Sequence, residues 1–199
     1  RAWSGQACFQ SHRGGGRYLG VFLLQHQDQN QIVMHASFSQ RLQAVNQKIE
    51  DLYSQLQSYN NEQLNRKPGP GQWSVLQVMH HLIQAETLSE RYVRKKLSFN
   101  PELKPAGLAG ALRLFLVRIN FVLPFKYKAP PGVGDDVLPE TSTLEDTMQQ
   151  WRRQRQSLKE LLENLPEGYH NKELYKHPLA GKLSLVQMLD FFEFHIQRH

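Results

Sequence analysis

Hydrophobic residues recur at helical spacing along four long stretches of the chain. In the first stretch the spacings alternate between four and three residues, which predicts a long amphipathic helix. Its apolar positions are Phe38, Leu42, Val45, Ile49, Leu52, Leu56 and Tyr59. Asn60, Asn61 and residues 67–71, which are rich in proline and glycine, should end this helix.

Capping-box patterns mark where the other three long helices begin. In each pattern a serine is followed three residues later by Gln or Glu, and the two side chains satisfy free backbone N–H groups of the first turn. The pairs are Ser74 with Gln77, Ser142 with Glu145, and Ser184 with Gln187. The second helix should run to about Leu97, and the fourth continues to His199.

Two charged residues occupy apolar faces of these helices. Arg155 takes the one polar position in the stripe of the third helix, which otherwise consists of Leu144, Met148, Trp151, Leu158, Leu162 and Leu165. Glu86 projects near the centre of the apolar arc of the second helix, where an unpaired carboxylate is costly. We therefore expect Glu86 to have a partner, such as a metal-bound histidine or water.

The segment between the second and third long helices is apolar, with Arg113 and Arg118 as its charged residues over positions 107–123. It could form a short helix over the bundle or a segment on a membrane surface, and we favour the first interpretation. A loop rich in proline and glycine follows over 124–139, and no stretch predicts a convincing strand. The chain is therefore predicted to be an all-α four-helix bundle, with a short extra helix or long loop between its second and third long helices.

The length of 199 residues fits one domain with a single core. Residues 1–33 lack sustained periodicity and contain a glycine-rich stretch, so we expect a disordered or non-native tail. The bundle domain should span 34–199, and we expect its last helix to be truncated at His199.

Charge, cysteine content and the lengths of apolar runs argue against several kinds of partner and site. The net charge of +6 is spread over basic tracts at helical spacing, which is typical of solvated helix faces, so we expect no nucleic-acid partner. With Cys8 as the single cysteine, neither a disulfide framework nor a thiolate metal site can be built. No apolar run approaches the roughly eighteen residues that span a bilayer, so we expect no membrane partner and a cytoplasmic location.

Four of the nine histidines lie on predicted helices, namely His80, His81, His195 and His199. The other five lie in or near the tail or in a polar loop, and we do not expect them to be ligands: His12, His26, His35, His170 and His177. His195 and His199 are four residues apart and share one helix face, where two imidazoles can reach one ion.

Projection of the last helix places His199 inside its apolar arc and His195 at the edge. A buried histidine without a partner costs about 1–3 kcal/mol, so these side chains need hydrogen bonds or a metal. From the residues alone, an ordinary histidine pair near a helix end and a metal site remain alternatives.

Two stretches, 71–86 and 177–199, resemble the metal-binding second helix and the final helix of the DinB-like (YfiT-like) family, and 125–131 is similar to a loop of one of its branches. The resemblance covers about residues 37–199. It implies a four-helix bundle of unusual helix order that holds a divalent metal ion, Zn²⁺ or Ni²⁺, through His81, His195 and His199. The neighbouring His80 leaves the first ligand open, and the helical projection only tilts the choice towards His81.

Three imidazole ligands leave a coordination position free, as in catalytic zinc sites. The resemblance implies a thiol-dependent S-transferase that acts on a small-molecule thiol and an electrophilic substrate, with Glu86 as an orienting group or proton acceptor. Metal-dependent hydrolysis is the alternative among enzymes. A non-catalytic bundle that acts in partner binding or as a homodimer is the alternative outside enzymes.

Overall fold

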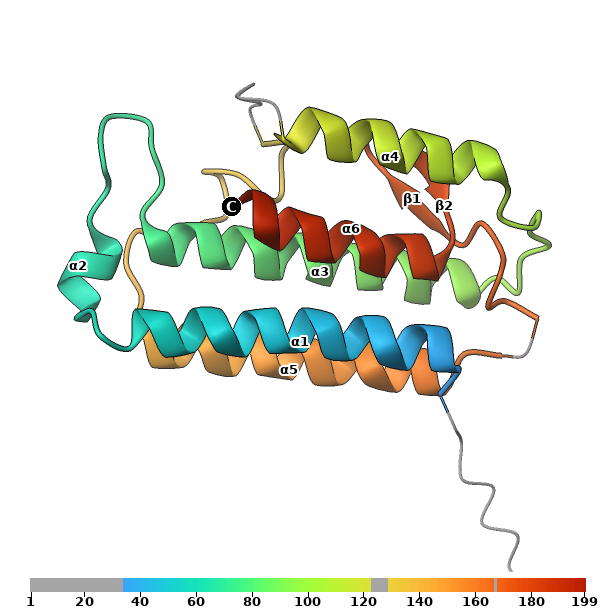
Figure 1. Ribbon diagram of the computed structural model, residues 1–199, viewed down its shortest axis with the longest axis horizontal. Helices are drawn as coiled ribbons and strands as arrows, with labels where there is room; N and C mark the ends of the chain where they lie inside the picture. The colour runs from blue at the N-terminus through green and yellow to red at the C-terminus, as the bar shows by residue number, and fades with distance from the viewer. Residues whose placement is uncertain (1–33, 123–128, 167) are drawn as a thin grey trace, which may run out of the picture. The chain divides into compact units, whose positions relative to one another are not determined.

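The computed structural model describes residues 34–122, 129–166 and 168–199, which contain six helices and two short strands. The elements are α1 (Ala36–Leu56), α2 (Asn61–Asn65), α3 (Val75–Leu97), α4 (Leu108–Val122), α5 (Leu144–Glu163), β1 (Tyr175–His177), β2 (Gly181–Leu183) and α6 (Leu185–Arg198). The predicted all-α four-helix bundle is confirmed, with α1, α3, α5 and α6 as its long helices (Figure 1). The predicted tail over 1–33 and most of the loop stretch 125–131 lie outside the described residues.

The order of the helices around the bundle brings distant parts of the sequence together. Helix α1 packs against α5 and α6, and α3 packs against the same two helices from the other side. Helices α1 and α6 run in one direction while α3 and α5 run in the other (Figure 1). The amino-terminal half of α3 therefore lies beside the carboxyl end of α6.

Two of the three predicted capping boxes are confirmed. The Ser74 and Ser184 hydroxyls accept hydrogen bonds from the backbone N–H groups of Gln77 and Gln187, each at 3.2 Å. The side-chain oxygen of each glutamine in turn accepts a hydrogen bond from the backbone N–H of the serine. These reciprocal bonds fix where α3 and α6 begin.

The predicted cap of the third long helix is wrong by one residue. Helix α5 is capped by the Thr143 hydroxyl, which accepts from the Asp146 N–H at 3.1 Å. The Ser142 N–H donates instead to the Asn65 side chain at 3.0 Å, which holds Ser142 outside the helix.

The first helix also ends earlier than predicted. It stops at Leu56, and Asn60, which was expected to end it, caps the short helix α2 through a capping box with Gln63. Asparagine is a good N-cap because its side-chain oxygen accepts from the N–H groups of a first turn, so the same residue that disfavours one helix starts the next.

A β-hairpin was not predicted. Strands β1 and β2 pair antiparallel with Tyr175 opposite Leu183 and Lys176 opposite Lys182. Gly181 at the start of β2 has a φ of 69°, a conformation that glycine adopts without steric cost. Strands of three residues are too short to show a two-residue period, which explains why the sequence pattern missed them.

The segment predicted over 107–123 forms helix α4, which packs on α6 and β2 outside the bundle of long helices. Leu114 and Val117 of α4 are buried in a core cluster that also contains Phe192 of α6 and Phe38 of α1. A second core cluster around Trp151 joins α1, α3 and α5. No helix in the described part of the chain is long and apolar enough to span a bilayer.

Candidate metal centre

The imidazole rings of His81, His195 and His199 converge where α3 meets the end of α6. One nitrogen of each ring lies within 4.8 Å of the corresponding nitrogens of the other two. The Nε2 atoms of His81 and His195 are 3.2 Å apart. Two nitrogens bound to one zinc at 2.0–2.1 Å in tetrahedral geometry lie about 3.4 Å apart, so this spacing suits a shared ion.

A backbone carbonyl orients His81. Its Nδ1 atom lies 2.6 Å from the carbonyl oxygen of Val133. Because a carbonyl oxygen can only accept, Nδ1 carries the proton, and the neutral ring presents the Nε2 lone pair to His195 and His199. This is the tautomer that a metal-ligating histidine needs.

Aromatic rings pack against the histidines. The Trp73 ring centroid lies 4.9 Å from that of His81. Phe191 stacks on His195 with centroids 5.0 Å apart, and Phe121 lies 5.7 Å from the same ring. The site therefore has apolar walls that restrict the rotation of His81 and His195.

The three histidines are held in their neutral form. Burial lowers the pKa of His195 well below its usual value, and the neighbouring His199, His81 and His177 lower it further. Burial also lowers the pKa of His81, although the hydrogen bond to Val133 partly opposes this effect. Burial, His81 and Arg198 lower the pKa of His199 to about 4. Neutral imidazoles have the free lone pair that metal ligation requires.

The loop that carries Val133 is tied to the amino end of α3. The indole N–H of Trp73 donates to the Asp135 carboxylate at 2.5 Å, and the Gln77 amide donates to the Pro139 carbonyl at 3.1 Å. The Asp136 carboxylate accepts from the Gly132 N–H at 2.8 Å, next to Val133. No pattern in the sequence marked this loop as a support for His81, because the supporting atom belongs to the backbone.

The structure separates the two neighbouring histidines of α3. The Nε2 atom of His80 lies 3.2 Å from the hydroxyl of Thr147 on α5, away from the cluster. His81 faces α6 instead. The helical projection favoured the side of α3 that carries His81, and the ring of His81 is the one that lies beside those of His195 and His199.

The projection of the last helix was wrong about which histidine is buried. His195 is buried, whereas His199 is exposed at the helix end, although its ring packs against those of His81 and His195. The physical reason is that α4 covers a second side of α6, which buries Phe191 and widens the buried face to include His195.

Glu86 has a partner, but that partner is not a histidine. Its carboxylate accepts from Arg155 Nη1 at 3.0 Å and from the Trp151 indole N–H at 3.4 Å. Arg155 Nε donates in turn to Asn46 on α1 at 2.7 Å. No hydrogen bond between Glu86 and a histidine occurs within the described residues. Glu86 and Arg155, which the sequence pattern placed on the apolar stripes of two different helices, pair with each other instead.

His177 was expected in a polar loop, yet it is buried on β1. Its Nδ1 atom accepts from the backbone N–H groups of Leu179 and Ala180, and its ring centroid lies 4.3 Å from that of Phe191. Burial lowers its pKa to about 4. His177 therefore stabilises the hairpin turn and is not one of the three converging rings.

The donor set fits a borderline transition metal. Three imidazole nitrogens suit Zn²⁺, Ni²⁺ or a similar ion, whereas Mg²⁺ and Ca²⁺ prefer oxygen ligands. With three protein ligands, a four-coordinate ion would keep one position for a water or substrate. Three protein ligands is the number found in catalytic zinc sites, whereas structural zinc sites have four.

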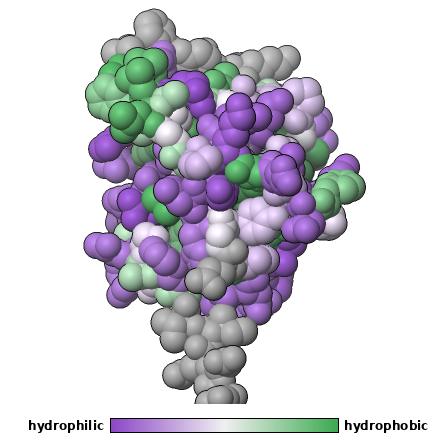
Figure 2. Space-filling view, turned by 90° about the vertical axis from the view of Figure 1, so that its right-hand side faces the viewer, coloured by the Kyte–Doolittle hydropathy of each residue, from purple (hydrophilic) through white to green (hydrophobic). Residues whose placement is uncertain are grey.

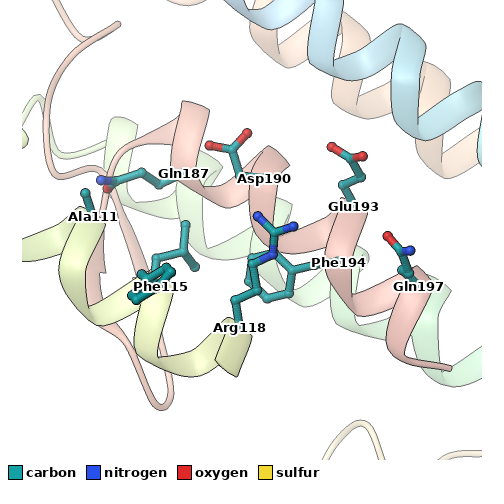
Figure 3. Close-up of a pocket in the computed structure, with 9 residues that line it drawn as sticks. Ala111, Phe115, Arg118, Gln187, Asp190, Glu193, Phe194 and Gln197 are labelled. Carbon is teal, nitrogen blue, oxygen red and sulfur yellow. The ribbon is translucent and has the colours of Figure 1, made fainter. Parts of the chain in front are cut away.

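A separate groove of about 390 Å³ runs between α4 and α6 (Figure 3). Its lining includes Phe115 and Arg118 from α4, and Asp190, Glu193 and Phe194 from α6. None of the three converging histidines lines it. The groove is therefore distinct from the candidate metal centre.

Comparison with known proteins agrees with this description. The chain is 27% identical over 159 residues to an Oceanobacillus iheyensis protein named "Putative metal-dependent hydrolase OB0782", and the match covers 76% of this chain and 77% of that protein. No solved structure gives a significant match. Residues 42–199 match the sequence model of the DinB superfamily, and the chain therefore belongs to this family.

Proposed function

We propose that the protein is a divalent-metal-dependent enzyme that transfers a small thiol to an electrophilic substrate, with His81, His195 and His199 as its metal ligands. The convergence of three neutral imidazole nitrogens within 4.8 Å of one another carries this proposal. A bound divalent cation would lower the pKa of a thiol or water in its remaining position and so supply a nucleophile at neutral pH.

The protein's own residues prepare that position. The Val133 carbonyl keeps the Nε2 lone pair of His81 directed at the other two rings. Trp73 and Phe191 pack against the imidazoles and lower the local polarity, which favours an apolar acceptor. In the overall reaction a carbon–sulfur bond forms, the bond from carbon to its leaving group breaks, and the thiol proton passes to solvent.

The surroundings favour a thiol over water as the nucleophile. A thiol has a pKa of about 8.5 and needs a far smaller shift to ionise near pH 7 than water, whose pKa is about 15.7. The three-residue cluster contains no carboxylate, and the buried Glu86 is already paired with Arg155. A thiol that ionises readily has less need of a neighbouring base.

Hydrolysis is the second candidate, because the Oceanobacillus iheyensis relative is named as a metal-dependent hydrolase. The same three histidines would serve as ligands, and water would replace the thiol. The two candidates differ in one requirement, since only the transferase depends on an added thiol.

Metal content of the full chain tests the site itself. After exposure to Zn²⁺ or Ni²⁺ and dialysis, plasma mass spectrometry should find about one ion per chain. His195→Ala should lose the metal, while His80→Ala should retain it because His80 contacts Thr147 instead. A wild-type protein that binds neither ion would disprove the metal centre and favour a packing role for the histidines.

Activity measurements then separate the two enzymes. The metal-loaded protein is incubated with glutathione and chlorodinitrobenzene, and separately with nitrophenyl acetate without thiol. The S-transferase proposal predicts turnover of the first pair that His195→Ala abolishes and His80→Ala preserves. Turnover of the ester alone, without any thiol requirement, would replace the transferase proposal with the hydrolase.

A further inference from the structure

Helix α4 is apolar on two opposite faces. Leu114 and Val117 on its inner face are buried against the bundle. Its outer face consists of Leu108, Leu112, Phe115, Leu116 and Ile119, which are between 41% and 89% exposed. At 100° per residue these five side chains occupy one arc of about 100° that no polar residue interrupts.

The apolar surface continues onto the hairpin. Leu179, in the turn between β1 and β2, is 67% exposed and lines a shallow cavity of about 300 Å³ together with Leu116 and other residues of α4. Figure 2 shows hydrophobic residues gathered at the top of the molecule, where α4 lies in Figure 1. Contiguous exposed patches of this kind mark sites of association.

The surroundings of this surface are basic. Helix α4 itself carries Arg113 and Arg118 and no acidic residue. Lys176 and Lys182 lie directly opposite each other across the hairpin, and both are exposed. Like charges placed opposite each other destabilise a strand pair, so the hairpin keeps this arrangement at a cost.

Two acidic residues of α6 line the groove beside α4, and each already has a basic partner on α1. Asp190 and Glu193 line the groove beside α4, but Asp190 pairs with Arg41 and Glu193 pairs with Lys48, both on α1 (Figure 3). Arg118 lies on the α4 side of the same groove and is exposed. The flank of the apolar face therefore presents positive charge.

A second copy of the chain is a poor occupant of this face. Two copies would bring the same basic segment against itself, and the charges would repel. The five side chains expose on the order of 500 Å² of apolar surface, taking about 150–200 Å² for a large side chain. A standard protein interface buries about 800 Å² on each partner.

An anionic lipid bilayer fits both properties of the surface. We propose that α4 attaches the protein to anionic membranes by inserting its outer apolar face at the headgroup boundary. Apolar insertion and attraction of lysines and arginines to anionic lipids act together in such binding. Since no described helix is long and apolar enough to cross a bilayer, α4 would lie along the surface. This proposal does not depend on the proposed function.

Vesicle sedimentation with the full chain tests the proposal. Vesicles of equal parts phosphatidylglycerol and phosphatidylcholine should pellet the protein at low salt, and vesicles of phosphatidylcholine alone should pellet much less. The double variant Leu112→Ser, Phe115→Ser should weaken binding at least about tenfold, because it removes two large apolar side chains from the face that inserts. Tyr59→Ser is the matched control, since Tyr59 is 53% exposed against 56% for Phe115 and lies outside α4.

Charge is tested with a second pair of variants. Arg118→Gln should weaken binding to the anionic vesicles several-fold, whereas Arg66→Gln, at an exposed position after α2, should not. Circular dichroism and sedimentation equilibrium are recorded for every variant. No binding to anionic vesicles, or equal binding to both vesicle types, overturns the proposal. So does a wild-type dimer that the double variant converts to a monomer, which would identify a second copy as the occupant.

Discussion

Arg155 Nη1 donates a hydrogen bond to Glu86 Oε2 at 3.0 Å, and both side chains are buried between α3 and α5. The carboxylate also accepts from Trp151, and the guanidinium also donates to Asn46. The pair thus connects three of the four long helices. Burying such a pair carries a substantial desolvation cost, and removing one partner leaves an uncompensated buried charge.

Breaking this pair should destabilise the protein strongly. Glu86→Ala leaves the Arg155 charge buried without its carboxylate, and we expect urea unfolding to show a loss of about 3–5 kcal/mol. The double variant Glu86→Met, Arg155→Met should recover most of the lost stability. The control is Glu50→Ala, which breaks the half-exposed Glu50–Arg152 pair and should cost less than about 1 kcal/mol.

The same variants address the catalytic role expected for Glu86. If its role is structural, the Glu86→Met, Arg155→Met protein should bind metal with an affinity close to that of the wild type. A large loss of metal affinity or of thiol transfer in this stable double variant would instead assign Glu86 to the site.

The loop that orients His81 should tune metal affinity. Asp136→Ala removes the acceptor of the Gly132 N–H and loosens the neighbouring Val133 carbonyl. Changes to groups that support a ligand typically lower metal affinity by about 10–100-fold, and competition with a chromogenic chelator would measure this. Asp51→Ala on α1 serves as the control. An Asp136→Ala affinity equal to that of the wild type would show that the loop is not needed.

Acid should destabilise the metal-free protein. Burial lowers the pKa of His177 from 6.5 to about 4, so below its ordinary pKa the unfolded chain binds a proton that the folded chain rejects. Stability therefore rises with pH over this window and is lost as the pH falls from about 6.5 to about 4, by on the order of 3 kcal/mol for this residue. The lowered pKa values of His81, His195 and His199 act in the same direction.

Urea unfolding in the presence of a chelator at about pH 7 and about pH 5 measures this effect. His177→Asn should show a smaller difference between the two pH values than the wild type. The prediction would be wrong if the wild type were equally stable, or more stable, at the lower pH.

Truncating a buried side chain of α6 should cost far more stability than truncating an exposed side chain of α4. Leu189 of α6 is fully buried, so Leu189→Ala should cost about 2–5 kcal/mol in a thermal or urea unfolding experiment. Leu108 of α4 is 89% exposed, and Leu108→Ala should stay within about 0.5 kcal/mol. A large cost for Leu108→Ala would mean that its face is covered.

Local patterns predicted most of the helical architecture. The capping boxes at Ser74 and Ser184 and the apolar stripe that ends at Leu165 are present as expected. These features depend on residues three or four positions apart, whose relation within a helix is the same in any fold. The hairpin was missed because three residues cannot display a period.

The candidate site was predictable only in part. The His195–His199 spacing marks one helix face, and His81 was matched to it by family resemblance rather than by geometry. The burial of His195 depends on α4, and the burial of His177 depends on its place in the hairpin. Burial of this kind is decided by which element covers a face, and a single helix projection does not contain that information.

The amino-acid sequence by itself determined four amphipathic helices, the start signals of α3 and α6, and the presence of imidazoles and opposite charges on the apolar faces. Only the tertiary structure decided that His81 rather than His80 meets His195, that Val133 orients it, and that Glu86 pairs with Arg155. These contacts join residues 52 to 114 positions apart. They depend on the direction and packing of whole helices, which a periodicity of 3.6 residues cannot specify.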